Sequence, residues 1–113
     1  MNNEIEINGE IYVKKNINKD KKCMMIRTYS AGVFCGYIEK QEDSTITLTE
    51  ARRIWSWEGA ASLSQLAIEG TSKPKECRFP CAVDRITLFN VIEIIEMTDK
   101  AVESIKKVPI WSA

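Results

Sequence analysis

Residues 1–22 combine an alternating segment with a lysine-rich stretch. Apolar and polar residues alternate over 4–13 on both sides of the Asn-Gly pair at 8–9, which is typical of a β-hairpin. A three-residue loop at 8–10 would pair Ile7 with Ile11 and keep the apolar side chains on one face, so we favour it over a two-residue turn. Residues 14–22 hold five lysines and predict a solvated connector.

The next apolar segments predict strands. Residues 25–37 are rich in β-branched and aromatic types, with an Ala-Gly pair at 31–32 that permits a bend or bulge. A polar turn is expected at 39–44, and the alternating run 45–49 predicts the strand that follows it.

Residues 51–57 fit two structures. As a helix they would begin at a capping box formed by Thr47 and Glu50. We favour a strand, because Trp-Ser-Trp is poor helix material and the segment continues a β run. A strand would place Arg53, Trp55 and Trp57 on one face.

The clearest helix spans 59–70, with Ser62 as its N-cap and Gly70 at its end. Strands are expected at 78–88 and 91–97, and Pro80 predicts that the first lies at an edge or is broken. Thr98 and Asp99 are expected to cap a short helix that runs to Lys107, before an extended end whose Trp111 packs back on the core. The fold class is therefore α+β, an antiparallel sheet with an N-terminal hairpin and two helices in the C-terminal half.

Composition narrows the range of functions. The 113 residues suggest one domain, with a hairpin and lysine-rich loop at 1–22 and a core with the ligand site at 23–113. Sixteen basic and sixteen acidic residues give no net charge, which argues against bulk binding of DNA or RNA. The chain has no histidine, so Ser-His and Cys-His nucleophile pairs are excluded and we expect no enzyme.

The four cysteines do not form a zinc pattern. Cys77 and Cys81 are one loose pair, while Cys23 and Cys35 stand apart from them and from each other. We expect reduced thiols, no metal and no cofactor. The chain shows no apolar signal segment and no run near the length of a membrane span, so we also expect no membrane association.

Three segments have chemistry suited to a phosphorylated, aromatic ligand: the Arg-Arg-Ile-Trp-Ser-Trp run at 52–57, the small residues 59–62 that begin a helix, and the basic and aromatic run 27–32. Each also has a simpler explanation. The tryptophans can belong to the core, Ser62 can be a structural cap, and 27–32 can be a half-buried strand. For the tryptophan run, residue chemistry alone favours the simpler explanation.

Three stretches together resemble a known group: 26–33, 51–67 and 108–111. They are similar to small phage proteins of otherwise unassigned function and, within that group, to the signal-sequestering Thoeris anti-defence proteins of phages and prophages. The resemblance covers about residues 25–111 and leaves out the N-terminal hairpin and the lysine-rich loop.

The resemblance implies a sponge. Such proteins bind the cyclic ADP-ribose isomers made by bacterial TIR-domain enzymes and hold them uncleaved in the cytoplasm of the infected host. They form dimers and larger homo-oligomers with pockets between subunits, and some also hold cyclic oligonucleotides. Within the matching blocks and just outside them, the chemistry suggests ligand-binding residues Arg27, Arg52 and Arg53 for pyrophosphate, Tyr29, Trp55, Trp57 and Phe79 for stacking, and Ser62 and Asn90 for hydrogen bonds.

Two other functions stay open. A protein-interaction module would inhibit a host enzyme by direct contact through exposed tryptophans, with no nucleotide bound. A hydrolase of cyclic nucleotides would work from carboxylates and would release an altered ligand.

Overall fold

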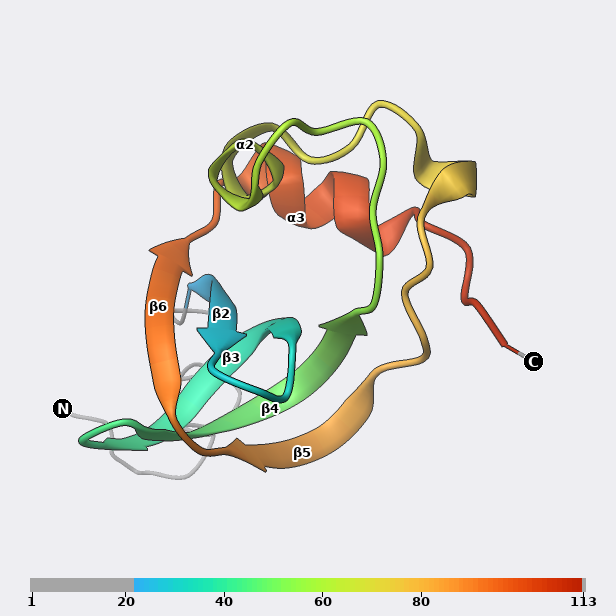
Figure 1. The fold of residues 1–113 in the computed structure, drawn as a ribbon. Helices are drawn as coiled ribbons and strands as arrows, with labels where there is room; N and C mark the ends of the chain where they lie inside the picture. The colour runs from blue at the N-terminus through green and yellow to red at the C-terminus, as the bar shows by residue number, and fades with distance from the viewer. Residues whose placement is uncertain (1–21, 113) are drawn as a thin grey trace, which may run out of the picture.

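The structure, a computed structural model, describes residues 22–112. Five strands and two helices make up most of this part of the chain (Figure 1). The elements are β2 (Cys23–Thr28), β3 (Val33–Glu42), β4 (Thr45–Ile54), α2 (Leu63–Glu69), a 3-10 turn (Pro74–Glu76), β5 (Val83–Leu88), β6 (Val91–Glu96) and α3 (Asp99–Lys106). The α+β class is confirmed, while the hairpin predicted at 4–13 lies outside the described residues.

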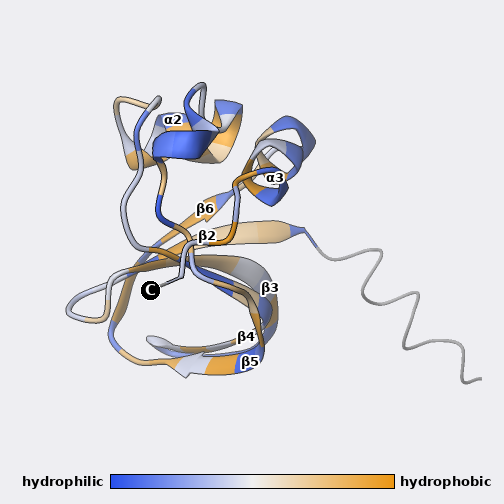
Figure 2. Ribbon diagram, turned by 90° about the vertical axis from the view of Figure 1, so that its right-hand side faces the viewer, coloured by the Kyte–Doolittle hydropathy of each residue, from blue (hydrophilic) through white to orange (hydrophobic). Residues whose placement is uncertain are grey.

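The sheet curls strongly because consecutive strands lie at its two edges. Its order is β5-β4-β3-β2-β6, and all neighbours are antiparallel. Only Phe89 and Asn90 join β5 to β6, so the edges must approach each other at that end. The N–H of Val91 also donates to the carbonyl of Ser44 at 2.9 Å. Figure 2 shows the resulting barrel-like curve beneath the helices.

Two hydrophobic clusters occupy the two faces of this sheet. The concave face encloses the cluster Ile26, Phe34, Ile46, Leu48, Ala51 and Leu88. The other face packs under α2 and α3 through Met25, Ile54, Leu66, Phe79 and Ile105, among others. A strand has side chains on alternate faces, so each central strand contributes to both clusters.

A bulge in β4 reverses its alternation. Between the pairs Tyr37–Thr49 and Cys35–Arg52, β4 carries one more residue than β3, and Glu50 has a φ of 50°. Ala51 therefore faces the concave cluster, as Leu48 does, and Arg52 faces the helices. Gly36 lies opposite the bulge, where an added Cβ would stand 2.9 Å from the carbonyl oxygen of Thr49.

Both helices have the N-caps that the sequence predicts. The Ser62 hydroxyl accepts from the N–H of Gln65 at 3.1 Å, and that of Thr98 accepts from Ala101 at 3.1 Å. The Thr98 hydroxyl also donates to the carbonyl of Ile68 at 2.5 Å, which ties the start of α3 to α2. No helix in the described range 22–112 is long and apolar enough to cross a membrane.

Several predicted boundaries differ from the structure. The turn expected at 39–44 is shorter, because β3 continues to Glu42. The runs 45–49 and 51–57 form one strand that ends at Ile54, with a single further bridge at Ser56. The strand expected at 78–88 begins at Val83, because Pro80 has no N–H for a ladder bond.

Candidate functional site

The turn that joins β2 to β3 forms the base of the candidate site. The Thr28 hydroxyl donates to the carbonyl of Gly32 at 2.8 Å and accepts from the N–H of Ala31 at 2.9 Å. One nitrogen of the Arg53 guanidinium donates to the carbonyl of Ala31 at 2.7 Å. The Arg53 guanidinium also lies over the ring of Phe34, 4.3 Å from its centroid. These two contacts hold the guanidinium in place.

Two exposed tryptophans stack beside this arginine. The rings of Trp55 and Trp111 lie 6.3 Å apart with an interplanar angle of 13°, and 60% and 40% of the two residues are exposed. The guanidinium of Arg78 lies 5.7 Å from the centroid of the Trp111 ring. We call Arg53, Trp55, Arg78 and Trp111 the tryptophan–arginine platform.

Backbone hydrogen bonds bring the three segments of the platform together. The N–H of Trp55 donates to the carbonyl of Arg78 at 3.1 Å, and that of Trp111 donates to Phe79 at 3.0 Å. An isolated parallel bridge between Phe79 and Ile110 holds the C-terminal segment beside residues 78–79. The platform is therefore a product of tertiary structure.

The platform arginines differ from Arg27 and Arg85 in their charge partners. Arg27 pairs with Glu93 at 3.5 Å and Arg85 pairs with Glu39 at 2.9 Å. Neither Arg53 nor Arg78 has a carboxylate within 4.0 Å in the part of the chain that the structure describes. An anionic ligand can therefore reach both guanidinium groups without displacing a carboxylate of residues 22–112.

A hollow of about 250 Å³ lies between the turn and the platform. Its walls are Ser30, Ala31, Gly32, Val33, Arg53, Ile54 and Trp55. The hollow therefore combines the polar backbone of the turn with the guanidinium of Arg53 and the indole of Trp55.

The nine predicted ligand-binding residues divide into two groups. Arg53 and Trp55 line the hollow. Exposed Tyr29 precedes Ser30 in sequence but does not itself line the hollow. Its N–H donates to the carbonyl of Asn90 at 2.9 Å, and Asn90 lies in the turn between β5 and β6, also outside the hollow. Arg27 is adjacent in sequence to the turn but forms the ion pair with Glu93.

The remaining predicted residues have structural contacts. Phe79 is fully buried in the core under the helices, which corrects the expectation that it stacks on a ligand. Trp57 packs against the same core and donates its indole N–H to the carbonyl of Ala60 at 3.2 Å. It does not share a face with Arg53 and Trp55, because the strand has ended before it. Ser62 is occupied as the cap of α2.

Arg52 is another predicted ligand-binding residue whose side chain is used within the fold. Its guanidinium donates to the carbonyls of Phe79, Pro80, Ile105, Val108 and Pro109 at 2.9–3.4 Å. It also lies 5.5 Å from the centroid of the Phe79 ring, and burial lowers its pKa. These contacts take up the donors that a pyrophosphate would need, so Arg52 holds the C-terminal segment instead.

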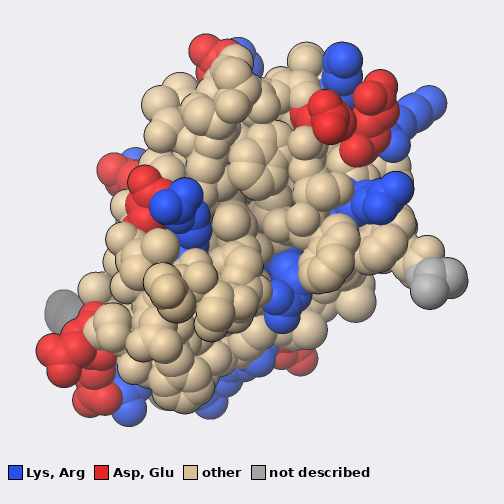
Figure 3. Space-filling model, viewed as in Figure 1, with Lys and Arg blue, Asp and Glu red and all other residues tan. Residues whose placement is uncertain are grey.

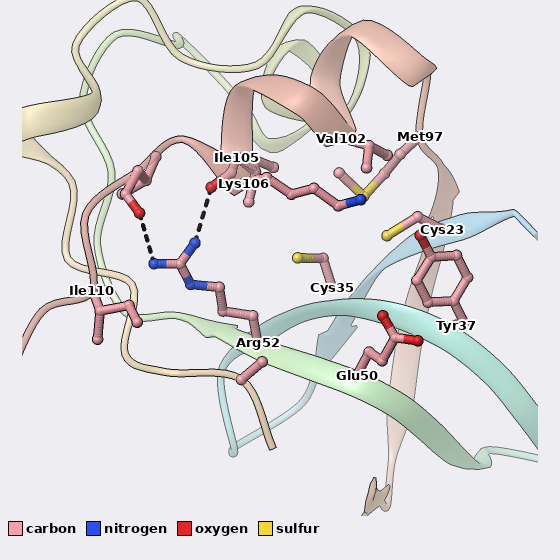
Figure 4. A pocket seen from close by; sticks show the side chains of 12 residues that line it. Cys23, Cys35, Tyr37, Glu50, Arg52, Met97, Val102, Ile105, Lys106 and Ile110 are labelled. Atoms are coloured by element: carbon pink, nitrogen blue, oxygen red, sulfur yellow. Dashed lines mark hydrogen bonds between the residues drawn. The ribbon is translucent and has the colours of Figure 1, made fainter. Parts of the chain in front are cut away.

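A second cavity, of about 270 Å³, lies between the sheet and α3 (Figure 4). Its walls are Cys23, Cys35, Tyr37, Glu50, Arg52, Ala82, Met97, Val102, Ile105, Lys106, Val108 and Ile110. Figure 3 shows that most charged residues lie toward the margin of the face seen in Figure 1, with a few basic side chains beside its hollowed middle.

The two cysteines in this cavity affect each other. Interaction with the Cys35 thiol lowers the pKa of Cys23, and the nearby Lys106 ammonium lowers it further, against the effect of burial. The same thiol interaction and burial raise the pKa of Cys35. Burial raises the pKa of Tyr37, with a smaller contribution from Cys23. Within residues 22–112, no three side chains of the types His, Cys, Asp and Glu converge on one metal position.

Sequence reasoning missed half of the platform. Arg78 has no basic or aromatic neighbour that marks it, apart from Phe79, which is buried. The expectation that Trp111 packs back on the core was wrong, because Trp111 is 40% exposed and stacks on the exposed ring of Trp55. Only long-range pairing brings these residues together.

Comparison with known proteins identifies a family but no activity. Residues 21–105 match the family described as "Domain of unknown function (DUF6948)". No curated protein and no solved structure matches the chain.

Proposed function

The chain belongs to the DUF6948 family, and we propose that it binds and sequesters a cyclic nucleotide second messenger without degrading it. The observation that carries this proposal is the tryptophan–arginine platform, which has two guanidinium groups free of carboxylate partners among the described residues beside an exposed indole stack. Indole offers a face for a base, and guanidinium binds phosphate with directional hydrogen bonds.

The expected contacts supply enough affinity for a sponge. Stacking of a base on an aromatic ring contributes about 1–3 kcal/mol, and a charge-assisted hydrogen bond contributes about 1.5–3 kcal/mol. Arg53 is already positioned by Ala31 and Phe34, so it loses little further freedom when it binds. In this proposal the ligand stacks on Trp55, and Arg53 and Arg78 contact its pyrophosphate.

The resemblance to Thoeris anti-defence proteins supports a specific ligand class. We propose a glycocyclic ADP-ribose made by bacterial TIR enzymes, with cyclic oligonucleotides as further ligands. The protein would then act for a phage in the cytoplasm of the infected host, as a binder and not as an enzyme. A chain without histidine suits this role, because sequestration needs no general acid or base.

The size of the hollow supports a homo-oligomer. Small-molecule sites usually enclose about 300–1,000 Å³, and the hollow beside Trp55 measures about 250 Å³ on one chain. A dinucleotide-sized ligand would therefore extend out of it. A second subunit placed over the platform would complete the enclosure and slow the release of ligand.

The first test separates sequestration from turnover. Purified protein is incubated with the product mixture of an active TIR enzyme and removed by filtration, and the filtrate is assayed for activation of the effector. We expect the signal to disappear and to return intact when the protein is heat-denatured. Signal that is lost for good would indicate a hydrolase and would overturn the proposal.

The second test locates the site. Trp55→Ala and Arg53→Gln should each weaken binding of the purified cyclic nucleotide at least tenfold in calorimetry, because each removes about 1.4 kcal/mol or more. Arg85→Gln is the matched control, because Arg85 pairs with Glu39 on the sheet. This variant should bind the nucleotide as the unmodified protein does. Unchanged binding in both platform variants would refute this site.

A protein-interaction module is the second candidate function. Besides the platform, the described surface exposes Tyr29, Phe89 and Ile110 at 64–78%, and aromatic residues are enriched at interfaces between proteins. In that case the filtrate would retain its full signal. A direct effect of the protein on the activity of the host enzyme would then support this candidate.

A further inference from the structure

Three sulfur atoms from separate elements line the cavity between the sheet and α3. Cys23 begins β2, Cys35 lies in β3, and Met97 follows β6 directly. The backbone pairs Cys23–Tyr37 and Met25–Cys35 place the two cysteines on one face, at diagonal positions of neighbouring antiparallel strands. The N–H of Met97 donates to the carbonyl of Cys23 at 3.1 Å, which holds the methionine beside that cysteine.

The surroundings of these sulfur atoms suit a soft ion. Cys35 and Met97 are buried, with 6% and 4% exposed, while Cys23 is more accessible and leaves an approach from solvent. Most of the cavity wall is apolar, from Val102, Ile105, Val108 and others. Thiolate and thioether ligands select Cu(I), whereas structural zinc takes four nitrogen or sulfur ligands in a tetrahedron.

Metal–thiolate bonds of about 2.3 Å separate two sulfur atoms on one ion by up to about 4.6 Å. Diagonal positions of neighbouring strands place two Cβ atoms within about 7–8 Å, a distance that two Cβ–Sγ bonds and such a bridge can span by rotation of the Cys23 and Cys35 side chains. Figure 4 shows both thiols directed into the cavity from neighbouring strands.

We propose that Cys23, Cys35 and Met97 form a binding site for one thiophilic monovalent ion, Cu(I). The ion enters as Cu(I) and remains Cu(I), so no electrons are transferred. Two thiols become thiolates and release two protons to solvent for each ion bound. The complex carries one net negative charge; Lys106 and Arg52 at the same cavity offset this charge, while the Glu50 carboxylate opposes it.

The other two cysteines provide internal controls. The Cys77 thiol is buried and contacts the carbonyls of Glu58 and Lys73 at 3.5 and 3.6 Å. Cys81 is exposed and does not line the cavity. A site defined by the three sulfur atoms should therefore use neither of them.

The experiment is an anaerobic competition for Cu(I) between the full chain and a chromophoric Cu(I) chelator. We expect one ion per chain, a loss of affinity of at least a hundredfold in Cys23→Ser and in Cys35→Ser, and a loss of about tenfold in Met97→Leu. Cys81→Ser should compete as the unmodified protein does. Retention of the ion by the double variant Cys23→Ser/Cys35→Ser, or no competition by the unmodified chain, would overturn the proposal.

A measurement on the unmodified protein excludes a folding artefact. Cysteines are alkylated with and without one equivalent of Cu(I), and each site is quantified by mass spectrometry. Cu(I) should protect Cys23 while the exposed Cys81 continues to react. Equal protection of both would mean that the ion binds without this site and would contradict the proposal.

Discussion

Arg52 and Arg53 are consecutive residues with opposite environments. Arg52 faces the helices and donates to five backbone carbonyls around the C-terminal segment. Arg53 faces the concave side, rests on Phe34 and presents its remaining donors beside Trp55. The same residue type thus stabilises the fold at one position and is available to a ligand at the next.

The first residue-scale prediction concerns Arg52. Arg52→Ala should lower the free energy of unfolding by about 2–4 kcal/mol, because it leaves partly buried carbonyls without donors. Urea denaturation followed by circular dichroism measures the change. Arg85→Ala should change it by less than about 1 kcal/mol, since it removes a single exposed ion pair. Equal effects would contradict a structural role for Arg52.

At the scale of elements, α2 shows how local signals and packing combine. Ser62 caps its start, and the side-chain oxygen of Gln65 accepts a hydrogen bond from the N–H of Ala61 at 2.8 Å. Leu63, Leu66 and Ala67 bury one face of a helix only seven residues long. Such a short helix depends on this packing, because its own hydrogen bonds are too few to hold it in water.

The cap gives a prediction that separates structure from binding. Ser62→Ala should destabilise the protein by about 1 kcal/mol and leave nucleotide affinity unchanged, since the hydroxyl is used by Gln65. Ser64→Ala is the matched control, because Ser64 lies inside the helix and is exposed. Thermal denaturation and calorimetry supply the two values. Loss of affinity without loss of stability would mean that Ser62 contacts the ligand and would contradict a purely structural role.

The contact between α2 and α3 gives a second element-scale prediction. Gly70 ends α2 with a φ of 78°, and an added Cβ would stand 2.3 Å from Ser104 of α3. Gly70→Ala should therefore cost more stability than Gly32→Ala. Gly32 also has a positive φ, of 99°, but the atom nearest to a Cβ added there would be a nitrogen of Arg53 at 3.9 Å. Similar melting temperatures for the two variants would show that Ser104 can shift away from the added Cβ at little cost in stability.

At the scale of the whole molecule, the platform depends on segments that are distant in sequence. Trp55 follows β4, Arg78 precedes β5 and Trp111 follows α3. Backbone hydrogen bonds and the carbonyl contacts of Arg52 connect these segments. The platform should therefore be lost together with the fold and not before it.

This dependence can be measured in urea. In a Trp57→Phe variant, tryptophan fluorescence reports the stacked pair, and circular dichroism reports the sheet and helices. We expect the same urea midpoint from both, as for a two-state transition. An earlier fluorescence transition would mean that the C-terminal segment detaches first and that the platform is only loosely joined to the fold.

Local patterns predicted many of the elements and part of the site. The caps at Ser62 and Thr98, the end of α2 at Gly70 and the break at Pro80 each depend on a few neighbouring residues, so the sequence alone indicates them. The bulge at Glu50 was not predicted, because it arises where β4 pairs with β3 around Gly36. That single extra residue decides which face Arg52 and Arg53 occupy.

The sequence by itself determined the α+β class, the absence of histidine and the caps of both helices, because composition and short-range periodicity are sufficient for these. Only the tertiary structure decided that Phe79 is buried, that Arg52 is occupied, that Arg78 and Trp111 join Trp55, and that Cys23, Cys35 and Met97 share a cavity. The physical reason is that each of these results depends on strand register and on contacts between distant segments, which no short stretch of sequence contains.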